Sequence, residues 1–247
     1  MNSRGSTNSG YFIVEGNIGV GKSTFLRIIQ NALKIPVIFE PVYRWQTING
    51  NHNLLDQFYQ DPQRWAYTFQ TYAFITRIME QEEYMKKAGG GLYIAERSVF
   101  SDRYCFTLNA YEMGLMSELE WQIYKEWFNW LVMQRLTKPS GIIYLQSPAQ
   151  LCYDRLKKRS RSEEAGISLD YLQRLENKHE AWIINKNYAE LDLKDVPVVV
   201  LNCSQEFETD LQVQQQFFMQ IEELIRGTHH HTSQTLSNPT LYERSCG

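Results

Sequence analysis

The stretch GNIGVGKST, from Gly16 to Thr24, restricts the fold of this 247-residue chain more than any other. It has the spacing G-x-x-x-x-G-K-S, with an apolar run before it (11–14) and an alternating helical pattern after it (25–33). Glycines let successive N–H groups point at an anion, and the following helix adds the positive end of its dipole. We therefore expect a nucleoside triphosphate site, in which Lys22 contacts the outer phosphates and Ser23 can bind Mg²⁺. The predicted binding residues of this loop are Gly16, Asn17, Gly19, Gly21, Lys22, Ser23 and Thr24.

The length and the charge of the chain limit what receives the phosphate. The chain fits one domain better than two. Its net charge of -3 gives no general attraction to nucleic acid polymers or anionic membranes. No apolar run approaches the roughly 18 to 20 residues of a membrane span, and the first ten residues are too short and polar for a signal peptide. We expect a small-molecule acceptor, a disordered N-terminus at 1–10 and a cytoplasmic protein without nucleic acid or membrane partners.

The hydrophobic pattern predicts an α/β domain. Apolar, β-rich segments separated by helical stretches occur at 11–14, 37–39, 92–95, 142–145 and 198–201. Parallel neighbours need crossover connections, so this alternation indicates a doubly wound parallel sheet covered by helices on both faces. We place the domain at residues 11–227 and expect residues 228–247, which are polar and include a run of three histidines, to form a disordered tail in preference to a metal site.

Two long helices are expected, at 62–87 and at 118–135. The second carries a dense set of aromatic residues, which suits either core packing or a subunit interface, and the sequence leaves these two interpretations open. The four cysteines are scattered and show no spacing typical of zinc or of a disulfide framework.

Charged residues follow two of the predicted strands. The second strand ends in Glu40, and the third ends in Glu96 and Arg97. Ligands of open α/β sheets bind beyond the carboxyl ends of the strands, so these side chains should converge near the phosphate loop. Two carboxylates and an arginine are costly to bury without a purpose. An internal salt bridge is the structural alternative.

Five stretches in order now carry a resemblance: GNIGVGKST, EPVYRW, DPQRWAYTFQTYAFITR, ERSVFSDRY and RLKKRSRSEEAGISLDYL. Together they resemble the deoxyribonucleoside kinase family, in particular its deoxycytidine and deoxyguanosine kinase branch, from residue 11 to about 207. The resemblance implies a P-loop kinase fold with a five-stranded parallel sheet and a small arginine-rich lid at about 155–167. It also implies transfer of the γ-phosphoryl of ATP to the 5'-hydroxyl of a deoxyribonucleoside, in nucleotide salvage. A second ERS, at 243–245, has no strand before it and is treated as chance.

By this resemblance, Glu40 would accept the 5'-hydroxyl proton and Arg97 would hold that hydroxyl and the arriving phosphate. Lys22 completes the catalytic set, and Ser23 and Glu96 would orient Mg²⁺. The charged run after the fourth strand could be a solvated helix face, but in the family it forms the lid that closes over the phosphates. The lid residues are Arg155, Arg159 and Arg161.

The acceptor pocket is predicted from the long helix at 62–87. Gln70, Ala73 and Arg77 share one face of it, and a carboxamide and a guanidinium can read the edge of a base. In the family's arrangement Gln70 faces the base, while Arg77 pairs with Asp102 beside it. The ring would be enclosed by Trp45, Phe69 and Phe106, for which core packing is the alternative; the sugar 3'-hydroxyl would be held by Tyr59 and Glu164.

Substrate preference is expected to follow from the same residues. The bulky charged pair of Arg77 and Asp102 resembles the members that accept deoxycytidine, deoxyadenosine or deoxyguanosine, and it leaves little room for the methyl group of thymidine. By the same resemblance, the loop NCSQEF would place Glu206 and Phe207 at the donor base. Its longer carboxylate and different lead-in depart from the relatives, and this leaves open whether ATP or UTP is the preferred donor.

Two other functions remain as alternatives: a catalytically silent nucleotide-binding subunit of an assembly, or a nucleoside monophosphate kinase. The retained loop, strand-end and lid residues disfavour the first. The absence of a cationic pocket for an acceptor phosphate disfavours the second. A homodimer is expected from the family.

Overall fold

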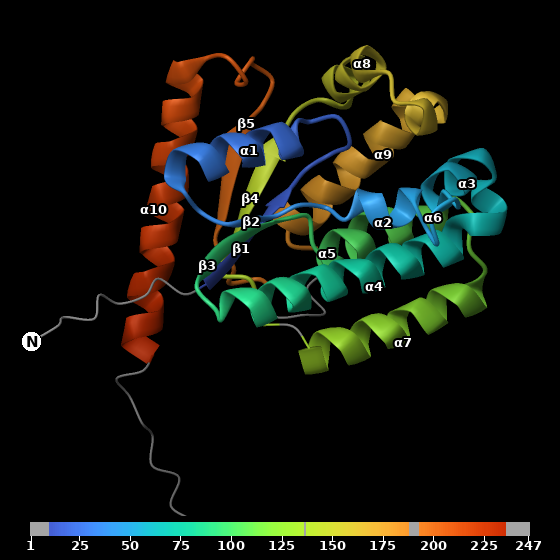
Figure 1. The fold of residues 1–247 in the computed structure, drawn as a ribbon, viewed down its shortest axis with the longest axis horizontal. Helices are drawn as coiled ribbons and strands as arrows, with labels where there is room; N and C mark the ends of the chain where they lie inside the picture. The colour runs from blue at the N-terminus through green and yellow to red at the C-terminus, as the bar shows by residue number, and fades with distance from the viewer. Residues whose placement is uncertain (1–9, 136, 188–192, 236–247) are drawn as a thin grey trace, which may run out of the picture.

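The computed structural model describes residues 10–135, 137–187 and 193–235 (Figure 1). A five-stranded sheet in the order β2-β3-β1-β4-β5 forms its centre, and every strand pair is parallel. The strands are β1 Gly10–Glu15, β2 Val37–Ile38, β3 Leu92–Glu96, β4 Gly141–Gln146 and β5 Val198–Asn202. The predicted doubly wound α/β fold is confirmed. The second strand is shorter than expected, because Phe39 lies outside it.

Alternate residues of each central strand face two separate cores. In β1, Phe12 and Val14 belong to one apolar cluster, whereas Tyr11 and Ile13 belong to the other. This period of two follows from the pleat of a strand, and burial of both faces explains why the strands read as continuous apolar runs. The sheet is therefore a middle layer with helices on either side.

The two helical layers are visible in Figure 1. The helices α1 (Lys22–Leu33), α8 (Ala149–Arg159) and α10 (Leu211–Thr235) cover one core, and α4 (Pro62–Ala88) and α7 (Glu118–Arg135) cover the other. The remaining elements lie between these helices and strands along the chain. They are α2 (Val42–Gln46), α3 (Leu54–Gln60), α5 (Val99–Ser101), the π-helical η1 (Asp102–Thr107), α6 (Leu108–Glu112), the 3₁₀ turn η2 (Ser162–Gly166), α9 (Leu169–His179) and the π-helical η3 (Glu180–Ile184).

The ends of α4 follow from its sequence. Asp61 accepts a hydrogen bond from the backbone N–H of Arg64, and Pro62 takes the first helical position, where a missing N–H costs nothing. The helix ends at Gly89, whose φ of 66° is the left-handed conformation of a common helix terminator. The helix thus covers the expected range and extends one residue further.

The carboxyl-terminal helix corrects one expected boundary. The backbone of α10 remains helical to Thr235, past residue 227, where the domain was expected to end and a disordered tail to begin. Phe217, Ile221 and Ile225 bury one face of α10 against the sheet. A helix nucleated by such packing extends at little cost past its last buried residue, even with polar residues. The rest of the expected tail (236–247) and the expected N-terminal segment 1–9 lie outside the described residues.

The aromatic residues of α7 divide between the two roles that the sequence left open. Trp121, Tyr124 and Phe128 are buried in the core, whereas Trp127 and Trp130 are 46% and 44% exposed. One stripe of the helix therefore packs inward, and a second stripe remains on the surface of this chain.

A buried histidine gives the fold an expected pH dependence. His179 is fully buried, with Nδ1 2.7 Å from the Leu175 carbonyl oxygen and the Tyr144 ring stacked on it. Burial, aided by the charge of Arg97, lowers the pKa of His179 from 6.5 to about 3. The unfolded chain then binds more protons than the folded one below the unfolded pKa. We expect this group to lower the free energy of unfolding by up to about 1.4 kcal/mol per pH unit as the pH falls between those two values.

The measurement is urea denaturation at a series of pH values, with His179→Phe and with His52→Asn as a control at an exposed position. The phenylalanine variant should lose part of the acid sensitivity, because it removes the proton-binding site at similar volume. An unchanged pH slope in that variant would contradict the assignment.

Candidate active site

A large cavity of about 740 Å³ opens at the carboxyl edge of the sheet. It lies between the phosphate loop, the ends of β2 and β3, the helices α3 and α4, and the lid segment around η2. All the site residues predicted from the sequence line it, with the exceptions of Gly16 and Asn17. Segments distant in the sequence thus meet where the topology predicts a ligand site.

Gly16 and Asn17 belong to the phosphate loop but do not line the cavity. The Asn17 side-chain amide donates to the carbonyl of Leu172 at 2.9 Å, and its oxygen accepts from the N–H of Ile18 at 2.9 Å. The Gly16 carbonyl accepts hydrogen bonds from Lys22 and Arg97. In this structure both residues stabilise the phosphate loop through these hydrogen bonds.

Lys22 is held inside the phosphate loop by the loop itself. Its ammonium group donates to the carbonyls of Gly16 at 3.2 Å and Asn17 at 2.8 Å. Burial, together with the neighbouring Arg97 charge, lowers the pKa of Lys22 to about 7. A bound triphosphate would favour the charged form, since an anion close to an ammonium raises its pKa.

Gly19 is the tightest position of the phosphate loop. Its φ is 83°, and a Cβ built on it would lie 2.3 Å from the carbonyl oxygen of Cys152 on α8. Because neither the backbone conformation nor the space suits a side chain, we expect Gly19→Ala to displace the loop and weaken triphosphate binding. Gly89 also has a positive φ, of 66°, but nothing lies within 4 Å of its added Cβ.

Gly89→Ala is therefore the matched control, with only the backbone cost of about 1–2 kcal/mol. Gly19→Ala should cost about 1–3 kcal/mol more, from the steric overlap. Urea unfolding and calorimetric titration with a non-hydrolysable ATP analogue measure the two effects. Equal stability and equal affinity in the two variants would contradict the prediction.

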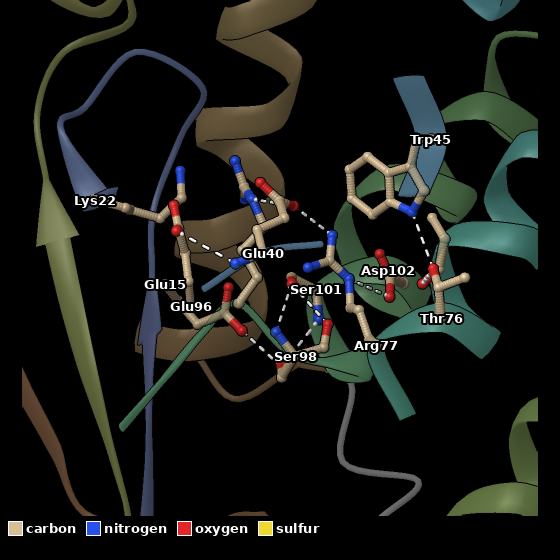
Figure 2. Close-up of polar contacts among 12 residues, drawn as sticks. Glu15, Lys22, Glu40, Trp45, Thr76, Arg77, Glu96, Ser98, Ser101 and Asp102 are labelled. Atoms are coloured by element: carbon tan, nitrogen blue, oxygen red, sulfur yellow. Dashed lines mark hydrogen bonds and ion pairs between the residues drawn. The ribbon is translucent and has the colours of Figure 1, made fainter. Parts of the chain in front are cut away.

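A network of charged side chains lines the cavity, and Figure 2 shows Glu40, Arg77 and Asp102 of this network. Arg77 donates through Nη2 to Glu40 and through Nε to Asp102 Oδ2 at 2.8 Å. Arg97 Nε lies 3.3 Å from the same oxygen of Glu40. Burial alone would raise the pKa of Glu40, but the Arg77 and Arg97 guanidiniums more than offset it and lower that pKa to about 2. Glu40 is therefore a carboxylate throughout the neutral pH range.

The contact between Arg77 and Glu40 joins two groups that the sequence analysis treated separately. Arg77 was expected beside the nucleobase with Asp102, and Glu40 beside the 5'-hydroxyl. The structure links them through one guanidinium, so the expected base-reading pair and the expected proton acceptor form one unit.

Glu96 and Ser23 meet at the mouth of the phosphate loop. The Ser23 hydroxyl donates to Glu96 Oε1 at 2.8 Å, and Glu96 Oε2 lies 3.4 Å from the backbone nitrogen of Glu40. Hydroxyl and carboxylate oxygens are suitable ligands for Mg²⁺, which uses one or two protein groups together with phosphates and water. Within the described residues no group of three or more His, Cys, Asp or Glu side chains could hold a metal ion.

The far side of the cavity is aromatic. The Trp45 indole donates to Thr76 at 2.9 Å, and its ring meets Phe69 edge-on at 5.4 Å. Phe58 stacks on Phe69 with ring centroids 4.7 Å apart. Gln70 is buried yet lines the cavity. Phe58 could not be expected from the sequence, because no motif marks it and α3 is too short to show a clear periodic pattern.

The lid arginines have partners in this structure. Arg159 and Arg161 both pair with the carboxylate of Glu164. Arg155 donates to the carbonyls of Val20 at 3.3 Å and Gln205 at 3.4 Å, and so connects the phosphate loop to the loop after β5. Glu163, which the sequence analysis did not select, accepts from Gln46 at 2.9 Å and ties η2 to α2. The lid therefore contacts both sides of the cavity.

Phe207 and Glu206 differ in exposure. The Phe207 ring is buried against Phe25 and Phe217, and it fills the space where a side chain at Gly21 would lie. Glu206 is exposed. Phe207 thus supports the phosphate loop at the edge of the cavity, and Glu206 is the freer of the two to meet a donor base.

The family model for deoxynucleoside kinase matches residues 12–226. The chain belongs to the deoxynucleoside kinase family. Similar proteins include deoxycytidine kinase 2 of Gallus gallus (39% identical over 220 residues, 80% of this chain and 83% of that protein) and deoxycytidine kinase of Homo sapiens (38% over 218 residues, 79% and 84%). Mitochondrial deoxyguanosine kinase of Xenopus laevis is 38% identical over 218 residues, 80% of this chain and 82% of that protein.

Membership of the deoxynucleoside kinases makes this chain a phosphotransferase that uses a nucleoside triphosphate to phosphorylate deoxynucleosides for salvage. The resemblance inferred from the five sequence stretches is confirmed. The relatives named above are deoxycytidine and deoxyguanosine kinases. They therefore support neither of the two alternative functions, the catalytically silent subunit and the nucleoside monophosphate kinase. No helix in the described part of the chain is long and apolar enough to cross a membrane.

Proposed function

We propose that this deoxynucleoside kinase transfers the γ-phosphoryl of ATP to the 5'-hydroxyl of deoxycytidine, deoxyadenosine or deoxyguanosine in preference to thymidine. The observation that carries this proposal is the buried network of Glu40, Arg77, Arg97 and Asp102, placed between the phosphate loop and an aromatic pocket. Such a network combines a carboxylate near the phosphates with a charged pair beside the base. We also propose that the protein acts in the cytoplasm.

The mechanism assigns a positioning task to each side chain. Glu40 orients the 5'-hydroxyl and accepts its proton, and Arg97 holds the hydroxyl beside the phosphate loop. Lys22 leaves the loop carbonyls to meet the outer phosphates. Transfer of a phosphoryl group has a loose transition state with charge on the equatorial oxygens, so positioning and positive charge supply most of the rate.

The lid and the metal site would supply positive charge to the phosphates of the bound nucleotide. Arg155, Arg159 and Arg161 would exchange their present partners for phosphate oxygens as the lid closes and excludes water. Ser23 and Glu96 would hold Mg²⁺, which supplies neutralising charge on the phosphates when bound.

The acceptor pocket is assigned from its lining. Trp45, Phe69 and Phe106 would enclose the base, with stacking worth roughly 1–3 kcal/mol per base in single-strand binding proteins. Gln70 supplies a donor and an acceptor for the base edge. Tyr59 and Glu164 both line the cavity near the lid and would hold the sugar 3'-hydroxyl. Arg77 and Asp102 occupy the volume that a thymine methyl group would need.

The experiment is coupled ADP release with Mg²⁺ and ATP across the four deoxynucleosides and their monophosphates. We expect turnover with deoxycytidine, deoxyadenosine or deoxyguanosine, weak turnover with thymidine and none with the monophosphates. Thymidine turnover equal to that of deoxycytidine would reject the proposed preference. Nucleotide binding without acceptor-dependent ADP release would reject the proposed reaction.

A homodimer is also proposed. Trp127 and Trp130 of α7, together with Ile75 and Met79 of α4, are large apolar side chains exposed on two helices that pack against each other. Exposed apolar surface of this kind is typical of subunit contacts. Sedimentation analysis of the protein at micromolar concentration should give the mass of two chains, and a mass of one chain would reject the dimer.

A further inference from the structure

Glu15 is a buried carboxyl group to which neither the sequence motifs nor the proposed mechanism gives a task. It is the last residue of β1, directly before the phosphate loop, and it is fully buried. Of the described residues, no ion-pair partner lies within salt-bridge distance of it. A carboxyl group in such surroundings is costly, so its retention at this position calls for a physical explanation.

Three hydrogen bonds around Glu15 join the end of β1 to the residues that follow β3, and we call these three bonds the clasp. On one side, the Val14 carbonyl accepts from the backbone N–H of Arg97 at 2.9 Å. On the other, the Gly16 carbonyl accepts from Arg97 Nη1 at 2.9 Å. Between them, Glu15 Oε1 accepts from the Ser98 hydroxyl at 2.6 Å, as Figure 2 shows. Val14, Glu15 and Gly16 therefore hold the two residues that follow β3, Arg97 and Ser98.

The turn that this clasp holds has an unfavourable backbone conformation. Arg97 has a φ of 62°, in the left-handed region that residues with a side chain rarely adopt. Such a conformation persists only where the surroundings fix it, and it is frequent at functional sites. The φ of Arg97 places its backbone in the clasp while its guanidinium reaches both the phosphate loop and Glu40.

Ser98 transmits the restraint from Glu15 to the helix that follows. Its oxygen accepts from the backbone N–H groups of Phe100 at 3.2 Å and Ser101 at 3.4 Å, as the N-cap of α5. A hydroxyl has one proton to donate, and here that proton is directed to Glu15. The next residue after Ser101 is Asp102, the partner of Arg77.

We propose that Glu15 is a positioning residue for phosphoryl transfer: through Ser98 it fixes the turn after β3, so that Arg97 remains directed at Glu40 and the phosphate loop. This inference rests on the proposed role of Arg97. It differs from a purely structural role for Glu15, which would change stability without changing the rate of the bound complex.

The test is steady-state kinetics of the full chain. We expect Glu15→Ala and Ser98→Ala each to lower kcat by about 10- to 100-fold, because small displacements of a positioning group carry losses of this size. The KM for the deoxynucleoside should change less than kcat does, since the aromatic pocket that encloses the base is untouched. The double variant should be no slower than Ser98→Ala alone, because Ser98→Ala already removes the contact with Glu15.

Conservative replacements should restore the rate. Glu15→Gln keeps an acceptor oxygen for Ser98, and Ser98→Thr keeps the hydroxyl, so each should return kcat to within about threefold of the original chain. Glu180→Ala is the matched control: Glu180 accepts from Tyr144 at 2.9 Å and Gln146 at 2.7 Å, away from the cavity. It should lower the melting temperature and leave kcat unchanged.

The inference is overturned if Glu15→Ala and Ser98→Ala keep kcat within about threefold, or if Glu15→Gln and Ser98→Thr lose as much as the alanine variants. If Glu15→Ala does not fold, the three remaining single variants decide by the same criteria. Arg97→Lys separates this inference from the proposed function. Loss of kcat in Arg97→Lys with normal kcat in Ser98→Ala rejects only the positioning role, whereas normal kcat in Arg97→Lys rejects the proposed role of Arg97.

Discussion

Replacing Glu40 by glutamine is expected to lower kcat by about 100- to 10,000-fold, the range typical of losing a positioned general base. Glutamine keeps an oxygen that can accept from Arg77 and Arg97, so the network should retain most of its geometry. The loss would then come from the missing proton acceptor. Single-turnover phosphoryl transfer to deoxycytidine measures it, and near-normal turnover would remove Glu40 from the role of base.

Glu80→Gln is the matched control for Glu40→Gln. Glu80 is also a carboxylate held by an arginine, Arg44, but it lies on the outer side of α4 and outside the large cavity. The kcat of Glu80→Gln should remain within about twofold of that of the original chain, because ion pairs near the surface contribute little to stability. A comparable loss in both variants would indicate a general effect of removing charge.

The pH dependence of kcat/KM offers a second check on Glu40. Its pKa is held at about 2 in the free protein, so it stays charged well below neutral pH. Because kcat/KM reports the ionisation of the free enzyme, protonation of Glu40 should produce no fall in rate between neutral pH and about pH 5. A carboxylate of low basicity is sufficient here, since in a loose transition state the hydroxyl becomes acidic late.

Replacing Arg77 alone by methionine is expected to destabilise the protein by about 3–5 kcal/mol. Arg77 is the ion-pair partner of Asp102, and both side chains are buried. Removing the cation leaves a buried carboxylate without its counter-charge. Adding Asp102→Ala should recover much of the loss, because no uncompensated charge then remains beside the pocket and Glu40 keeps Arg97.

The double variant should also change the substrate preference. Two apolar side chains of smaller volume replace the charged pair, which makes room for the methyl group of thymidine. We expect the ratio of thymidine to deoxycytidine kcat/KM to rise in Arg77→Met with Asp102→Ala. An unchanged ratio would reject the assignment of this pair to base discrimination.

Arg44→Met is the control for the stability measurement. Arg44 bridges Glu80 and Glu83 at 3.0 Å on the partly exposed outer side of α4. Water solvates the carboxylates that it leaves, so its loss should cost only about 1 kcal/mol or less. A loss as large as that of Arg77→Met would show that burial is not the reason for the Arg77 effect.

Much of the fold and of the site follows from local sequence. The apolar runs separated by helical stretches correspond to β1 through β5, because a parallel strand buried on both faces must be apolar along its length. The predicted helix at 118–135 has those bounds in the structure. The boundary at 227 could not be read in the same way, since the polar residues of 228–235 lie on a helix nucleated by apolar residues earlier in α10.

Other features had no local signal. Glu15 precedes the phosphate loop as one more residue of a strand, and only the pairing of β1 with β3 brings it to Ser98. Phe58 is one aromatic residue among many until α3 packs on α4 and stacks it on Phe69. The link between Arg77 and Glu40 joins residues 37 positions apart along the chain.

By itself, the sequence determined which local features follow one another along the chain. These are a phosphate loop after the first strand, acidic residues shortly after the second strand and at the end of the third, and an arginine-rich segment after the fourth. These are local patterns, because loop conformation, strand burial and helix charge depend on neighbouring residues. Only the tertiary structure decided which charges share a partner. Ion pairing and burial depend on distances between segments, and parallel pairing of β1, β2 and β3 brings Glu15, Glu40 and Arg97 together at the carboxyl end of the sheet.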